Sequence, residues 1–384
     1  MVHAVRMGLS MRSVALSFGV SVGSVALWVG RAHGQRLDRV DFSDAKPGRA
    51  TNRLPAPLER RILRARQQLR TSVLGEYGAQ AIARELAARR PTEHLPSRAT
   101  IHRVLVRHGA VDSAHRQRRP PPPKGWHLPE VAQARAELDS FDFIEDLKIA
   151  SGPLVSILTA TSLHGALADA WPMTQPTARH TLDRLLQRWR QEGLPGYAQF
   201  DNDTVFQGTH RFADSLGRVI RLCLALGVTP VFAPPREPGF QNAIEGFNAL
   251  WQAKVWRRHQ VAALEHLEHL SAAYIAAYRG KTASRAEAAP HRRPVPKGFK
   301  LDLNAPLRGT VIYIRRSTDS GSVSVLGRQF PVDTQWIRRL LRCEVDFTNK
   351  RIRFYALRRR EPHDQPLLHE TSYLRVDRPF TGKP

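Results

Sequence analysis

The spacing of apolar residues changes along the chain, and each change marks a different kind of structure. Apolar positions recur every three to four residues over 4–32 and again over 59–107, which is typical of helices. Between 136 and 290, short β-branched runs alternate with amphipathic segments, and beyond 308 apolar and polar residues alternate at period two. This order predicts all-α units first, then an α/β core, then a small β-domain.

Residues 1–34 contain two short helical patterns joined by a glycine. Ser10 is placed to cap the first helix, Gly19 to end it, and Ser21 to cap the second. Two short helices around a tight turn are typical of a helix-turn-helix, whose second helix reads base edges in the major groove. Residues 35–58 are rich in Gly and Pro and are predicted to be a linker.

A second helix-turn-helix is predicted over 59–114, ending in a helix that follows Ser97. Its apolar positions face inward and its basic positions face outward, whereas a plain helical bundle, the alternative, would not favour basic side chains on that face. We interpret the outward side chains as DNA-binding residues: Arg98, His102, Arg103 and Arg107. Residues 115–135 are basic and rich in Pro, which is typical of a semi-rigid spacer.

Residues 136–290 are predicted to form a mixed sheet with helices on both faces. Three β-branched runs, read as strands joined in hairpins, are followed by an amphipathic helix and a strand that ends at Asp201. A helix over 210–226, one more strand and a helix carrying Glu245 complete the core.

The last part of the chain follows a basic linker at 291–307. Alternation at period two, with Asp–Ser–Gly and Thr–Asn turns, predicts about five short strands over 308–360 in a small β-barrel, and 361–384 form a tail. Arg315 and Arg316 on its first strand are expected to contact the phosphate backbone of DNA rather than base edges.

The charge of the chain points to a polyanionic partner. Lys and Arg number 59 against 34 Asp and Glu, a formal net charge of +25. Residues 1–130 carry 23 basic and 9 acidic groups, residues 131–294 carry 18 and 16, and residues 295–384 carry 18 and 9. A generally basic surface would not leave the middle nearly neutral, so we expect the ends to hold DNA and the middle to concentrate carboxylates.

Two cysteines, Cys223 and Cys343, cannot form a disulfide framework or a structural zinc cluster. No run of about 18 apolar residues and no signal-peptide cleavage pattern is present. These features predict a cytoplasmic, nucleoid-associated protein without a membrane partner.

Residues 136–290 resemble the catalytic core, with an RNase H-like fold, that retroviral integrases share with insertion-sequence transposases of the DDE class. The resemblance rests on the order of strands and helices, an acid in the first strand, FDND at 200–203 and PREPGFQNAIEGFN at 235–248. Helix-turn-helix units before the core and an SH3-like β-domain after it fit the same family. Two departures are a long interval from Asp201 to Glu245 and the Thr–Ala–Thr sequence at 159–161, where that family often has an acidic pair.

The resemblance implies a triad of two Asp and one Glu that holds two Mg²⁺ or Mn²⁺ ions. Asp201 matches the second member and Glu245 the third; for the first, Asp142 is favoured over Asp139. Converging carboxylates repel one another unless cations neutralise them, and carboxylates with water suit these ions. The implied reaction is hydrolysis at the ends of a mobile element followed by strand transfer into target DNA.

Further residues on the Glu245 helix are expected to contact phosphate, with a solvated basic face as an equal alternative: Asn248, Lys254, Arg257 and Arg258. The implied partners are double-stranded DNA, at the element ends and the target, and further copies of the chain. The sequence leaves open whether an ATPase helper takes part. The alternative function is that of an inactive or domesticated relative that only binds DNA and regulates.

Overall fold

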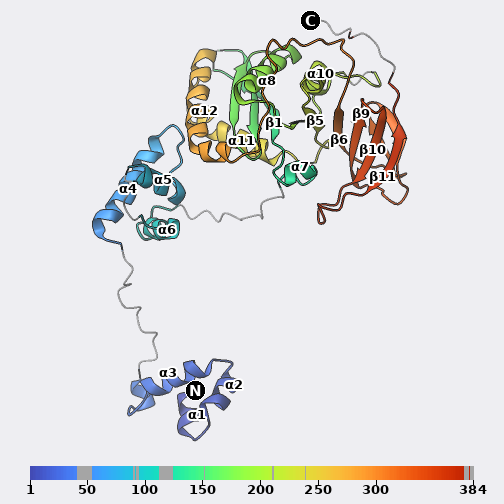
Figure 1. Ribbon diagram of the computed structural model, residues 1–384. Helices are drawn as coiled ribbons and strands as arrows, with labels where there is room; N and C mark the ends of the chain where they lie inside the picture. Colours follow the sequence, from blue (N-terminus) through green and yellow to red (C-terminus); the bar gives the residue numbers. More distant parts are fainter. Residues whose placement is uncertain are drawn as a thin grey trace. The chain divides into compact units, whose positions relative to one another are not determined.

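The computed structural model describes residues 1–40, 54–89, 91, 95–111, 124–150, 152–209, 212–237, 239–375 and 380. The chain divides into two compact units, Met1–Leu63 and Arg64–Pro384 (Figure 1). Most of the first predicted linker and the Pro-rich part of the second lie outside the described residues.

The first unit contains α1 (Val2–Arg6), α2 (Met11–Phe18) and α3 (Val22–Arg31). The predicted caps are confirmed: Ser10 accepts a hydrogen bond from the backbone of Ser13, and Ser21 accepts one from Ser24. Gly19 ends α2 with a left-handed φ of 62°, and the axes of α2 and α3 differ in direction by 112°. Within the described ranges, no single helix is long and apolar enough to cross a membrane, although α2 and α3 as a bent pair meet that test.

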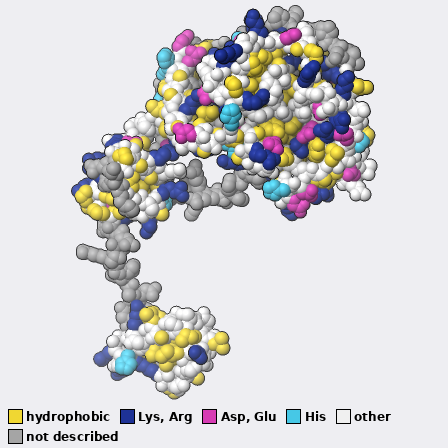
Figure 2. Space-filling view, viewed as in Figure 1, with side chains coloured by type: hydrophobic (Ala, Val, Ile, Leu, Met, Phe, Trp, Pro, Cys, Tyr) yellow, Lys and Arg dark blue, Asp and Glu magenta, His cyan; other side chains and the backbone are white. Residues whose placement is uncertain are grey.

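The surface of the first unit is more apolar than a base-reading surface needs. Leu16, Phe18 and Leu27 are 87%, 56% and 54% exposed, and Figure 2 shows apolar side chains gathered on this unit. These exposed side chains, two from α2 and Leu27 from α3, offer van der Waals contacts only. Its assignment to a helix-turn-helix stays a prediction.

After α3, a 3₁₀ turn, η1, covers Leu37–Arg39. A second group of helices contains α4 (Ala56–Thr71), α5 (Ala79–Arg89) and α6 (Arg98–Arg107). α5 packs on α6 through buried side chains that include Ile82, Leu86 and Ile101. Ser97 caps α6 as expected. The linker prediction at 35–58 is wrong at its end, because α4 already begins at Ala56.

The core is a mixed sheet, as predicted, and is consistent with an RNase H-like core. Its strands are β1 (Leu138–Lys148), β2 (Leu154–Ser162), β3 (Ala168–Met173), β4 (Tyr197–Phe200) and β5 (Thr229–Phe232). They lie in the order β3-β2-β1-β4-β5, with antiparallel pairing from β1 to β3 and parallel pairing from β1 to β5. The carboxyl ends of β1, β4 and β5 therefore meet at one edge, where α/β sheets place their sites.

Helices cover both faces of this sheet (Figure 1). On one face, α11 (Asn242–Trp251), the π-helical turn η2 (Gln252–Trp256) and α12 (Leu264–Glu287) pack on β1, β2 and β3. On the other face lie α8 (Ala178–Glu192), α9 (Thr204–Gln207) and α10 (Arg218–Ala225). The helix expected over 210–226 is thus shorter than predicted: residues 212–217 are not helical, and residues 210 and 211 lie outside the described chain.

The carboxy-terminal strands continue the core sheet. They are β6 (Thr310–Arg316), β7 (Ser322–Val325), β8 (Arg328–Pro331), β9 (Leu340–Asp346), β10 (Arg351–Ala356) and β11 (Leu367–Ser372). β6 pairs in parallel with β5, opposing Phe232 with Tyr313, and β9, β10 and β11 follow β6 in one nine-stranded sheet. β5 and β6 thus cover each other's edges, and β11 extends the strands beyond 360 into the expected tail, while an SH3-like barrel stays a prediction.

Two predicted spacers also belong to the core. Trp126, Leu128 and Val131, the last in α7 (Pro129–Ala132), are buried against β1 and β5 side chains. In the linker at 291–307, Arg292 pairs with Asp139 and the backbone of Arg293 bridges to Leu194. Apolar and ion-pairing side chains within basic, Pro-containing stretches explain why composition alone misplaced these boundaries.

Candidate active site

Three carboxylates from separate elements lie near the carboxyl edge of the parallel strands. Asp142 is in β1, Asp201 directly follows β4, and Glu245 is in the first turn of α11. Asn248, one turn after Glu245, donates a 2.8 Å hydrogen bond to Asp142 Oδ2 and so ties α11 to β1. Because the charges of Asp201 and Glu245 also act on Asp142, the three acids predicted from the sequence lie in one neighbourhood.

The charges of these acids act on one another. Burial, together with the negative charges of Asp201, Glu245 and Glu145, raises the pKa of Asp142 to about 7, although the hydrogen bond from the backbone of Phe143 opposes this rise. Burial, with the nearby charge of Asp203, also raises the pKa of Asp201. A cation that entered this neighbourhood would relieve the repulsion.

Asp142 and Asp139, the two candidates for the first acid, lie on opposite faces of β1, because they are three residues apart in a strand. Asp139 is fully buried and is paired with Arg188 and Arg292. Although burial opposes it, the charges of these two guanidinium groups hold the pKa of Asp139 well below its usual range. Only Asp142 therefore faces Glu245, and Asp139 is already neutralised by arginine.

The donor atoms around the three acids suit a hard divalent cation. All are carboxylate oxygens, and the amide Oδ1 of Asn248 beside them is buried without a hydrogen-bond partner. In the part of the chain that the structure describes, no three His, Cys, Asp or Glu side chains form a ready-made metal site. Asp142, Asp201 and Glu245 are thus neighbours, and their carboxylates would have to move closer together to bind one ion.

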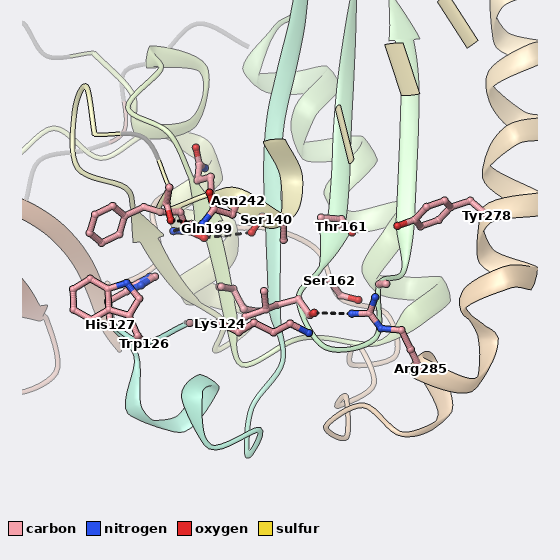
Figure 3. A pocket seen from close by; sticks show the side chains of 18 residues that line it. Lys124, Trp126, His127, Ser140, Thr161, Ser162, Gln199, Asn242, Tyr278 and Arg285 are labelled. Carbon is pink, nitrogen blue, oxygen red and sulfur yellow. Dashed lines mark hydrogen bonds between the residues drawn. The ribbon is translucent and has the colours of Figure 1, made fainter. Parts of the chain in front are cut away.

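Asp201, Asp203 and Glu245 line an open pocket of about 570 Å³ together with residues 233–237, Phe240 and Gln241. Phe240 and Gln241 also form part of a second pocket, of about 290 Å³, in which Ser140, Gln199 and Asn242 lie together (Figure 3). Among the described residues, no Asp or Glu lines the second pocket. Chemistry that requires carboxylates therefore belongs to the first pocket, which we call the acidic pocket.

The structure gives several predicted phosphate ligands other partners. Asn248 is buried on Asp142, and Lys254 donates to the carbonyl oxygen of Gly75 at 2.9 Å. Arg258 donates to three carbonyl oxygens at the end of α4: those of Arg70, Ser72 and Val73. These three side chains thus have intramolecular partners, and their contact with phosphate stays a prediction; the π-helical turn η2 shifts the helical period for Lys254 and Arg258, which lie in it and after it.

The other predicted DNA ligands have two environments. On α6, Arg98, His102, Arg103 and Arg107 are exposed, in the direction predicted. Arg257 is exposed and donates to Gln252, and Arg316 is exposed and pairs with Glu237. Arg315 instead points to the carboxyl ends of β4 and β5, where it contacts Asn202 and Ala233.

Sequence reasoning missed two residues beside Asp201. Asp203 caps α9 by accepting a 2.7 Å hydrogen bond from Val205, and its own backbone N–H donates to Asp201 Oδ1. Asn202 donates to the carbonyl oxygen of Ala233 at 2.7 Å. The run Asp–Asn–Asp after a short strand is the signal that could have revealed them, because these side chains favour tight turns.

Comparison with known proteins gives likenesses of structure. No protein-family model and no curated protein matches the sequence. The catalytic core domain of BIV integrase is similar at 20% identity and a TM-score of 0.27, over 37% of this chain and 80% of that one. A simian T-cell lymphotropic virus intasome in complex with the PP2A regulatory subunit B56 gamma is similar at 12% identity and a TM-score of 0.31, over 69% of this chain and 84% of that one. At these values neither likeness assigns the chain to a family.

A pH test addresses the state of Asp142. Folding raises its pKa from 3.8 to about 7. Between about pH 4 and about pH 7, without metal, Asp142 is therefore protonated in the folded state and ionised in the unfolded state. Asp142 therefore destabilises the fold increasingly as pH rises from about 4 to about 7. We expect Asp142→Asn to raise the free energy of unfolding by about 1 to 3 kcal/mol at pH 8 and to leave it unchanged at pH 4.

Urea titrations in EDTA at the two pH values measure this difference. Mg²⁺ should stabilise the wild type at pH 8 more than it stabilises Asp142→Asn. Equal unfolding free energies of both proteins at pH 8 would show that Asp142 carries no such repulsion.

Proposed function

We propose that the chain is a DNA strand-transferring enzyme, a polynucleotidyl transferase of the DDE type that acts on the ends of a mobile element. The supporting observation is that Asp201 and Glu245 line one open pocket and that the charges of both act on Asp142, whereas Asp139 is paired with arginine. Clustered, repelling carboxylates in a cleft are a candidate catalytic site.

The three acids would hold Mg²⁺ or Mn²⁺, and two such ions supply activation of water or of a 3′-hydroxyl and stabilisation of the leaving oxygen. The chain's own contribution is to hold the ligands. Asn248 orients Asp142 by donating to one of its carboxylate oxygens, while the backbone N–H of Phe143 donates to the other. The backbone N–H of Asp203 donates to Asp201, and the first turn of α11 carries Glu245.

DNA binding is assigned to the basic surfaces. The exposed residues of α6, Arg98, His102, Arg103 and Arg107, would contact the element ends, and Arg257 and Arg316 would contact backbone phosphates. The net charge of +25 supports this partner. Copies of the chain would act together, since two element ends must be joined.

The test is strand joining by the full chain on labelled duplexes that carry the ends of its element. We expect hydrolysis of the 3′ end and joining to target DNA in Mg²⁺ or Mn²⁺, and loss of both products when EDTA removes the ions. Gel-shift binding should persist in EDTA, because the basic side chains do not need the metal.

A catalytically inactive, DNA-binding regulator is the competing function. It predicts binding of the same duplexes with no joined or hydrolysed product in either metal. That result, from protein with a normal unfolding transition, would overturn the enzymatic proposal.

A further inference from the structure

The carboxy-terminal strands reach the acidic pocket through β6. β6 is parallel to β5, which is parallel to β4, so the carboxyl ends of all three lie at the same edge. Asp201 follows β4, Ala233 follows β5, and Arg315 is the second-to-last residue of β6. A residue far away in sequence is thereby placed beside the turn that carries a candidate metal ligand.

The contacts of Arg315 converge on that turn. Its Nη2 donates to Asn202 Oδ1 at 2.9 Å, and its Nη1 donates to the carbonyl oxygens of Ile314, at 2.9 Å, and Ala233, at 3.4 Å. Asn202 Nδ2 donates to the same carbonyl of Ala233 at 2.7 Å. The guanidinium, the amide and the carbonyl thus form a closed set of hydrogen bonds immediately after Asp201.

The partners of Arg315 are unusual for a guanidinium beside acids. Among the residues that the structure describes, no carboxylate forms an ion pair with it, although Asp201, Asp203 and Glu237 all line the adjacent pocket. Its ring partner is Tyr313, with the guanidinium carbon 5.0 Å from the ring centroid. The guanidinium therefore holds neutral oxygens in place and leaves the pocket's carboxylates to other ligands.

We propose that Arg315 is a positioning residue for the acidic pocket, which fixes the direction of the Asp201 carboxylate through Asn202. This inference rests on the proposed function. A planar guanidinium reaches the amide and both carbonyls at once, whereas a lysine ammonium keeps the charge and cannot span them in the same plane. Groups that orient metal ligands affect metal affinity about 10- to 100-fold.

The first experiment measures Mn²⁺ binding to the full chain by electron paramagnetic resonance, with Asp201→Asn subtracted as the background. We expect Arg315→Lys to weaken Mn²⁺ binding about tenfold at unchanged charge. Arg351→Lys is the matched control: Arg351 is on the same sheet and pairs with Glu370, and its replacement should change Mn²⁺ binding less than twofold. Wild-type affinity in Arg315→Lys would overturn the proposal.

Asn202→Ala provides a second variant that does not depend on tolerance of lysine in β6. It should weaken Mn²⁺ binding to a similar extent. The variant that combines Asn202→Ala with Arg315→Lys should bind Mn²⁺ no more weakly than the single variant of lower affinity, because both changes act through one contact. If the losses of Mn²⁺ affinity in the two single variants added up in the double variant, Arg315 would not act through Asn202.

Hydrogen exchange of the metal-free chain separates this inference from the proposed function. Exchange over 201–207 should become faster in Arg315→Lys and stay as in the wild type in Arg351→Lys. If the wild type binds no Mn²⁺ at Asp201, the proposed function fails, and this exchange measurement alone then decides the role of Arg315. Unchanged exchange over 201–207 would overturn it.

Discussion

Asp201→Asn and Glu245→Gln are each expected to abolish strand joining, with a loss of at least about 10³-fold, or about 4 kcal/mol of transition-state stabilisation. Each change keeps the shape of the side chain and removes one negative charge. The charge is needed because each acid would hold a cation against the repulsion of its neighbours. Gel-shift affinity for the same DNA should be retained, since neither side chain is part of a basic surface.

Asp146→Asn is a suitable control for these variants. Asp146 is exposed near the end of β1 and has a left-handed φ of 57°, a conformation that asparagine also tolerates. We expect joining at the wild-type rate from this variant. Joining by Glu245→Gln at more than a tenth of the wild-type rate would show that Glu245 is not a ligand of the reacting ions.

Features set by neighbouring residues could be predicted from the sequence. Ser10, Ser21 and Ser97 cap helices where the spacing of apolar residues predicted them, because a cap acts within one turn. The alternation of side chains in β1 likewise separates Asp139 from Asp142, once the strand is known to be buried on both faces. The sequence therefore predicted the candidate acids together with the elements that carry them.

Features set by distant pairing could not be predicted in this way. Nothing near Thr310 indicates that β6 pairs with β5, because the pairing depends on opposed residues such as Phe232 and Tyr313, whose rings stack with centroids 5.1 Å apart. The π-helical turn after Trp251 has no local glycine or proline to signal it. The position of Arg315 follows from the β5–β6 pairing, and the positions of Lys254 and Arg258 follow from the π-helical turn.

The opposite face of β1 carries the largest expected effect on stability. Arg188, fully buried in α8, pairs with Asp139 and Asp169, and Asp139 also pairs with Arg292. We expect Arg188→Met to lower the free energy of unfolding by about 3 to 5 kcal/mol, because it leaves buried carboxylates with too few cations. Arg190→Met, two residues along the same helix and exposed, should change it by less than about 0.5 kcal/mol.

Urea unfolding followed by circular dichroism measures both variants, and equal midpoints for the two would show that the buried network contributes no net stability. The comparison also bears on the acidic pocket, because β1 carries Asp139 on one face and Asp142 on the other. The arginines neutralise Asp139 permanently, whereas Asp142 keeps a raised pKa and no cationic partner within the described ranges. One strand thus holds a carboxylate whose charge is already compensated by the protein and another whose charge is left for an ion from solution.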